Sequence, residues 1–168
     1  CNFESSYTYQ GTVYPLVEVA GECWFGENLR ASAFSNGDAM DAFEAGSTET
    51  ASPWYVPIEP WISLDDDEAF GSAYNQAAVL DARNVCPSGW HVSSHADWDA
   101  LAAFFGGYMT LNINLASTGV SGDQSGYWNV STSNENGTGL NVHPAGAVSP
   151  LTGSDPSGND VIFALNDG

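Results

Sequence analysis

Two cysteines, Cys1 and Cys23, flank the stretch that most restricts how this chain can fold. Between them, YTYQGTVYPLVEV is rich in Val, Tyr and Thr and predicts two strands around a turn, with Gly11 and Pro15 as punctuation. A hairpin of this kind returns the chain to its start and brings the two cysteines together. We therefore expect a disulfide between Cys1 and Cys23, which in the chain-entropy model stabilises the fold by about 3 kcal/mol.

Cys1 also stands where a bacterial lipoprotein carries its lipidated cysteine, and this alternative stays open. The sequence after Cys1 runs directly into the first expected strand, without the usual flexible tether. It opens CNFESS, without the basic and apolar leader of a signal peptide, and it contains no run of about 18 apolar residues. We therefore expect a mature chain with no membrane insertion.

The segment SSHADWDALAAFFGG predicts the one clear helix of the chain, near residues 94–105. Ser94 suits the N-cap, and Asp97 three residues later completes a pair that resembles a capping box. Two glycines after the apolar run suit the end of the helix. The apolar residues that fall on one face at helical spacing are Trp98, Leu101, Ala102 and Phe105.

The rest of the chain is rich in strands and loops. Asn36-Gly37 is a strong turn dipeptide, residues 41–68 predict a long surface loop, and AFGSAYNQAAVLDA fits either a short helix or a buried strand. Small and polar residues dominate from residue 117 onward, with short strands expected near 139–143 and 161–165. A length of 168 residues suits one domain. We expect a single loop-rich α+β domain over residues 1–168, with antiparallel strands.

The charge balance excludes two classes of partner. The chain carries 21 acidic residues against two arginines and no lysine, which gives a formal net charge of -19. A surface this negative repels phosphate backbones and anionic lipid headgroups, so we expect no nucleic-acid partner and no binding to membrane surfaces. Salt screens the self-repulsion of such a chain, so a saline or marine setting is one interpretation of this charge, and ordinary acidic solubility is the other.

The motif CPSGWHV, residues 86–92, places a cysteine, a turn, a tryptophan and a histidine close together. Nucleophilic catalysis by Cys86 and His91 would need hydrogen-bond contact and an activating environment, and the acidic surroundings favour a raised thiol pKa instead. His91 and His95 flank an expected strand-to-helix junction, which does not suit a zinc site. We interpret the motif as a strand-turn-strand unit with Trp90 in the core. Cys86 is then unpaired or bonded to another chain.

Carboxylates are the candidate metal ligands. The acidic run in SLDDDE offers oxygen ligands for calcium, and SDPSGND resembles a calcium-binding loop in composition; both lack the EF-hand spacing, and a solvated surface loop is the alternative for each. Nothing in the spacing of the acidic residues selects a pair of the kind that glycosidases use. The candidate calcium ligands are Asp155, Asn159 and Asp160.

Aromatic and asparagine residues mark candidate glycan positions. Trp54, Tyr55 and Trp61 lie in the expected loop and are candidates for stacking on sugar rings, with core packing as the alternative. Two glycosylation sequons begin at Asn129 and Asn136.

Three segments, which follow one another along the chain in the family's order, resemble the Fibrobacter succinogenes major paralogous domain. This is a family of extracellular modules related to the C-type-lectin and sulfatase-modifying-factor folds. The three segments are GECWFGENLRASAFSNGD, FGSAYNQAAVLDARNVCPSGWHVSSHADWDAL and NGTGLNVHPAG, within a resemblance that covers roughly residues 7–165. The resemblance implies a C-type-lectin-like fold. It also implies a closing segment whose terminal cysteine pairs with Cys86; here the sequence runs to VIFALNDG without it, and a strand from a neighbouring copy is one way to supply it.

Resemblance and composition together favour a non-catalytic extracellular or cell-surface module for adhesion or structural assembly, including filament formation and glycan binding. The expected partners are further copies of the chain, other surface proteins, or glycans. The alternative is a virion surface protein, a phage fibre or capsid decoration that recognises the host. An enzyme related to sulfatase-modifying factors is a distant alternative, because that chemistry uses a reactive cysteine pair late in the chain and no cysteine follows Cys86. We expect no catalytic residues and no cofactor other than calcium.

Overall fold

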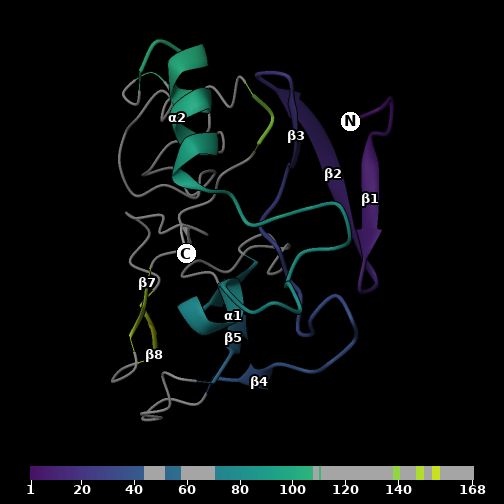
Figure 1. Ribbon diagram of the computed structural model, residues 1–168, viewed down its shortest axis with the longest axis vertical. Helices are drawn as coiled ribbons and strands as arrows, with labels where there is room; N and C mark the ends of the chain where they lie inside the picture. The colour runs from purple at the N-terminus through teal and green to yellow at the C-terminus, as the bar shows by residue number, and fades with distance from the viewer. Residues whose placement is uncertain are drawn as a thin grey trace, which may run out of the picture.

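The computed structural model describes residues 1–43, 52–57, 71–107, 110 and 138–140, and the backbone of residues 147–149 and 153–155. Within these residues the chain forms three small sheets and two helices, in an α+β arrangement with long irregular connections (Figure 1). The elements are β1 (Ser6–Tyr9), β2 (Thr12–Val19), β3 (Glu22–Phe25), β4 (Asp41–Ala42), β5 (Trp54–Pro57), β6 (Ser72–Tyr74), α1 (Gln76–Val79), α2 (His95–Phe104), β7 (Ala147–Ser149) and β8 (Gly153–Asp155).

The sheets have the orders β1-β2-β3, β4-β5-β6 and β7-β8. Among the strands that the structure describes, the pairs are antiparallel as expected, except β4 with β5, which are parallel. These two strands also occupy part of the expected 41–68 loop.

Both hairpins of the β1-β2-β3 sheet turn on two residues with positive φ. Gln10 and Gly11 have φ angles of 48° and 84°, and Ala20 and Gly21 have 56° and 85°. Two consecutive positive φ angles are what a type I′ hairpin turn requires, and glycine reaches them without steric cost. The chain therefore returns on itself twice within Ser6–Phe25, as the alternation of strand-forming residues predicts.

Pro15 lies inside β2 and does not interrupt the strand, contrary to expectation. Leu16 donates its backbone N–H to Ser5, whereas the Pro15 carbonyl accepts from Gly26 on the opposite side of the strand. The N and carbonyl of one strand residue point the same way, so the missing Pro15 N–H faces the β3 side, at the point where β3 ends. The proline therefore removes no backbone hydrogen bond between β2 and β1.

The two faces of β2 bury different side chains. Alternation sends Val17 and Val19 toward α2, where Leu101 and Ala102 are buried with Leu140. Tyr14 points to the opposite face, where its ring stacks on Phe25 with centroids 4.8 Å apart. In Figure 1 the first sheet stands beside α2, while α1, β4 and β5 lie below. The buried members of the second core cluster are Ala31, Phe34, Met40, Ala78, Val85 and Cys86.

Three tyrosine hydroxyls attach irregular segments to this second cluster. Tyr14 Oη accepts from the Arg30 backbone N–H at 3.0 Å, Tyr9 Oη donates to the Val85 carbonyl at 3.1 Å, and Tyr74 Oη donates to the Ala31 carbonyl at 2.9 Å. Burial raises the pKa of Tyr74 well above its usual value, so this hydroxyl keeps its proton and stays a donor. The loops are thus fixed by backbone bonds that no regular ladder supplies.

The ambiguous segment AFGSAYNQAAVLDA contains both a strand and a helix. It forms β6, and then Asn75 caps α1 by accepting the Ala78 N–H at 3.0 Å. The same Asn75 oxygen accepts from Trp54 N at 3.1 Å, and its amide donates to Ser52 O at 2.8 Å. One side chain therefore ends β6, starts α1 and ties both to β5. Of the strands expected near 139–143 and 161–165, residues 139 and 140 are not in a strand and the others lie outside the described residues.

Helix α2 confirms the expected helix and its cap. The Ser94 hydroxyl accepts from Asp97 N, and the Asp97 carboxylate accepts from Ser94 N at 2.7 Å, which completes the capping box. Leu101 and Ala102 are buried, and the chain leaves the helix at Gly106, where φ is 82°. Trp98 and Phe105 pack against the same core cluster.

We predict that Ser94→Ala lowers the free energy of unfolding by about 1 kcal/mol, because it removes the N-cap acceptor.

Backbone and hydroxyl hydrogen bonds from Ser94, together with His91, hold the pKa of Asp97 below its usual value. The folded state therefore favours the ionised carboxylate. The contribution of this carboxylate to stability is complete above the ordinary carboxyl pKa, and it is lost as the pH falls through the lowered pKa of Asp97 in the folded state. In urea unfolding, the difference in the free energy of unfolding between the wild type and Asp97→Asn should become smaller toward acid pH.

Glu22→Gln, at an exposed carboxylate outside α2, is the matched control for the loss of one charge. A difference between the wild type and Asp97→Asn that stays constant between about pH 7 and about pH 3 would contradict the assignment.

Candidate functional site

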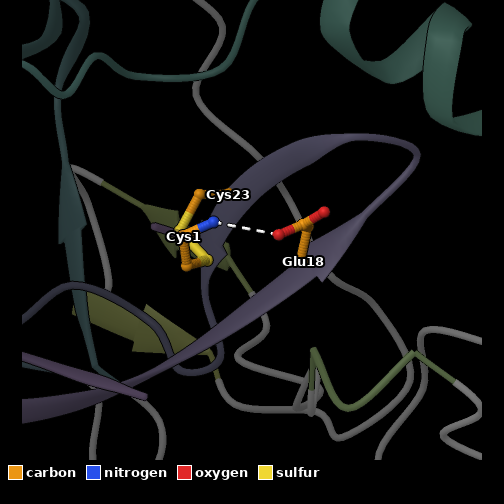
Figure 2. Close-up of a disulfide and its surroundings, with 3 residues drawn as sticks. All are labelled: Cys1, Glu18 and Cys23. Atoms are coloured by element: carbon orange, nitrogen blue, oxygen red, sulfur yellow. Dashed lines mark hydrogen bonds and ion pairs between the residues drawn. A yellow bond between two sulfur atoms is a disulfide. The ribbon is translucent and has the colours of Figure 1, made fainter. Parts of the chain in front are cut away.

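A disulfide between Cys1 and Cys23 closes the amino-terminal hairpin (Figure 2). The two Cα atoms are 5.0 Å apart across a sequence separation of 22. Glu18 lies opposite Cys23 in the β2-β3 register, and its Oε2 atom is 3.1 Å from the Cys1 amino group. This agrees with the pairing expected from the spacing. Because a sulfur in a disulfide cannot also carry a lipid, the structure does not support lipidation of Cys1.

The CPSGWHV motif forms a turn without flanking strands, so the strand-turn-strand interpretation was wrong. Trp90 N donates to the Pro87 carbonyl at 3.0 Å, and Gly89 has a φ of 86°. Asn84, just before the motif, holds both ends: its oxygen accepts from Cys86 N at 3.0 Å and its amide donates to the Trp90 carbonyl at 3.1 Å. A side chain takes over the backbone bonds that strands would otherwise have supplied.

Trp90 packs on the first sheet, in agreement with its expected place as an anchor. Its ring centroid is 4.3 Å from that of Phe25 and 5.8 Å from that of Tyr7. Aromatic pairs at these separations contribute beyond simple burial of apolar area. Through Trp90, the motif therefore packs a loop against β1 and β3.

Cys86 and His91 do not form a catalytic couple in this structure. Cys86 is a free thiol that is 7% exposed, and burial raises its pKa to about 11. The raised pKa matches the expectation, but its cause is burial and not the acidic surroundings. His91 is exposed, and its Nε2 atom lies 3.3 Å from Asp97 Oδ2. Cys86 is unpaired within this chain, and an intermolecular disulfide would first require its exposure.

The candidate stacking aromatics are used in packing where the structure describes them. Trp54 and Tyr55 lie on β5 and not in a loop, and both are half-buried. The Trp54 ring pairs with that of Phe43 at 4.6 Å, and Tyr55 packs against the second core cluster opposite Tyr74. Trp61 lies outside the described residues.

The other candidate ligand positions fall mainly beyond the described part of the chain. Asp155 ends the β8 backbone, while Asn159, Asp160 and the two sequons at Asn129 and Asn136 lie outside the described residues. Among the residues that the structure does describe, no group of three or more His, Cys, Asp or Glu side chains is placed to hold a metal ion.

Arg83 forms an ion-pair cluster that the motif search did not identify. Its guanidinium carbon lies 3.9 Å from the centroid of the Phe34 ring, and its nitrogens reach Asp81 at 2.8 Å and Asp38 at 3.3 Å. The hydrogen bond from Arg83 holds the pKa of Asp81 at about 2, and the same bond raises the pKa of Arg83 above its usual value. The other arginine, Arg30, pairs with Glu27 at 2.7 Å. Two arginines among 21 acidic residues are a signal for such pairing.

Neither α1 nor α2 has the length and apolar character needed to cross a bilayer, and the described residues contain no other candidate span.

The sequence matches the Fibrobacter succinogenes major domain over residues 17–162. The chain belongs to this family. No curated protein and no solved structure matches it.

The match divides the hairpin that the disulfide closes. Its first residue lies within β2, so Cys1 and β1 precede the matched residues, whereas Cys23, the CPSGWHV turn and α2 lie inside them. The disulfide therefore fastens an amino-terminal strand to the part of the chain that carries the family match.

We predict that removing the disulfide destabilises the chain by about 3 kcal/mol, because a closed loop of this length restricts the unfolded state. Denaturant unfolding of a Cys86→Ala background, with and without a phosphine reductant, measures the difference. Cys1→Ser/Cys23→Ser in the same background is the matched control and should be insensitive to reductant. Equal stabilities of the oxidised and reduced forms would contradict the prediction.

The native thiol of Cys86 should be nearly inert. At pH 8, three pH units below a pKa of about 11, about one thiol in a thousand is ionised, and the side chain is also buried. We expect reaction with a disulfide reagent to be slow in native protein and fast in urea. Absorbance of the released thiolate measures both rates, and a fast native reaction would contradict the burial.

Proposed function

We propose that this chain is a non-catalytic module of an extracellular surface that acts in adhesion or structural assembly. The observation that carries the proposal is the Cys1–Cys23 disulfide. Disulfides persist in oxidising compartments and are rare in the cytosol, so a hairpin held by one supports an extracellular place. The proposed fold within the α+β class is C-type-lectin-like.

The charge distribution supports a module that works in saline surroundings. The net charge of -19 has only two arginines against it, and both are engaged within the chain, Arg30 with Glu27 and Arg83 with Asp81 and Asp38. Such a surface attracts neither phosphate nor anionic lipid and keeps the protein soluble. Partners that suit it are other copies, other surface proteins, or neutral glycans.

The chemistry of the one free thiol supports a non-catalytic role over an enzyme related to sulfatase-modifying factors. Cys86 is buried with a pKa of about 11, and His91 is directed to Asp97 and not to the sulfur. An activated cysteine nucleophile needs the reverse, an accessible thiolate with a base in reach. Burial of the thiol and the raised pKa that it causes support a structural role for Cys86.

The compartment can be tested by counting maleimides on protein taken from the source organism and trapped before lysis. We predict one maleimide per chain after denaturation without reduction, on Cys86, and three after reduction. Immunogold electron microscopy of the same material should label an outer surface. Whether the label lies on a cell, a filament or a virion distinguishes among these three locations. Three maleimides without reduction, or label confined to the cytoplasm, would overturn the proposal.

A further inference from the structure

Strand β1 is an edge with no partner on its outer side. In the part of the chain that the structure describes, β1 pairs with β2 alone, and in Figure 1 it forms the outer margin of the first sheet. Leu16 N donates to Ser5 O, so the alternation of an antiparallel ladder directs the backbone groups of Tyr7 and Tyr9 toward β2. Those of Ser6 and Thr8 point away from it, and both residues are exposed.

Apart from its short length of four residues, this edge lacks the usual protection against strand addition. Natural edges are also kept from pairing by lysine, other charges, proline or a bulge. Residues 5–17, SSYTYQGTVYPLV, contain no charged residue in a chain with a net charge of -19, and the one proline in the segment lies on β2 and not on β1. The β1-β2 register is also continuous from Ser6 to Tyr9, without a bulge.

Exposed apolar side chains flank the same edge. Phe3 is fully exposed just before β1, and Val13, directly opposite Thr8 in the register, is 60% exposed. Phe3 and the preceding Asn2 have positive φ angles of 69° and 52°, an unfavourable conformation for a bulky residue. The Cys1–Cys23 disulfide fastens this turn to β3. The edge is therefore presented on a hairpin whose position is held covalently.

We propose that β1 is the contact through which a second copy of this chain binds, by antiparallel addition of its own β1. This inference rests on the proposed function, for which it names the partner. The charge restricts where a second copy can bind: two copies with a net charge of -19 each repel over most of their surface, and the uncharged hairpin is a place where they meet without opposing carboxylates. A two-fold axis at Tyr7 pairs Ser6 of each copy with Thr8 of the other.

The pairing leaves the interior of each copy unchanged. The tyrosines of β1 stay on the inner face, where Tyr7 contacts Trp90 and Tyr9 bonds Val85. Only the exposed groups of Ser6 and Thr8 change partner, from water to backbone. The result is a six-stranded sheet that runs through both copies, the mode by which edge strands add to sheets.

Sedimentation velocity of the intact, oxidised chain over a concentration series tests the inference. We expect a monomer–dimer equilibrium that shifts toward dimer at about 1 M NaCl, where the Debye length of about 3 Å screens the repulsion. Thr8→Pro removes an outward N–H in each copy and should raise the dimer dissociation constant about tenfold or more. Thr8→Val, which keeps the N–H, is the matched control and should dimerise like the wild type.

Ser6→Pro, at the first residue of the strand, where proline is tolerated, serves as the second variant if Thr8→Pro does not fold. Val13→Thr separates edge pairing from stacking of the exposed sheet face. A monomer under all conditions, or a dimer that survives Thr8→Pro and Ser6→Pro, would overturn the inference, as would one lost only in Val13→Thr. A monomer with surface label leaves the proposed function standing, whereas cytoplasmic label overturns that function whatever the state of assembly.

Discussion

Strand β2 pairs with β1 along Thr12–Pro15 and with β3 along Leu16–Val19. One of its faces packs Val17 and Val19 into the core under α2, and the other stacks Tyr14 on Phe25. One strand thus holds the edge hairpin, the platform under α2 and the platform under the CPSGWHV turn. Every other contact between the first sheet and the rest of the chain depends on its register, because a shift by one residue would exchange the two faces. The disulfide, placed beside the β2-β3 pair, restricts that register from outside.

Outside this sheet, side chains take the place of regular ladders. The Asn75 side chain satisfies backbone groups from two segments, the Asn84 side chain bonds the two ends of one turn, and three tyrosine hydroxyls bond to loop backbone. Buried backbone groups must be bonded, and a chain with few strands has to find those partners elsewhere. Gly71 shows how close the packing is: it has a φ of 73°, and a Cβ there would overlap Asn28. The loops are therefore ordered by specific polar contacts as well as by apolar burial.

The sequence predicts those parts of the fold that local chemistry decides. The turn at Gly11, the cap at Ser94 and the pairing of Cys1 with Cys23 follow from residue type and spacing, and the structure has all of them. Pro15 was misread because its effect depends on which side of the strand its nitrogen faces, which is a tertiary fact. The parallel β4-β5 pair was missed for the same reason, since a two-residue strand has no periodicity to detect. At the candidate site, Trp90 was recognised, but the role of Asn84 depends on contacts that no motif encodes.

Charge and covalent restraint act together on this fold. A net charge of -19 disfavours the compact state through self-repulsion, and the repulsion is strongest in dilute salt. Two features oppose it: the disulfide restricts the unfolded chain, and the few cations lie in ion pairs that bridge loops, as Arg83 does between Asp38 and Asp81. The first works only where thiols stay oxidised, and the repulsion is least where salt is high. The free energy of unfolding of this chain should therefore be greatest in oxidising conditions at high salt, and the proposed function would place it in such conditions.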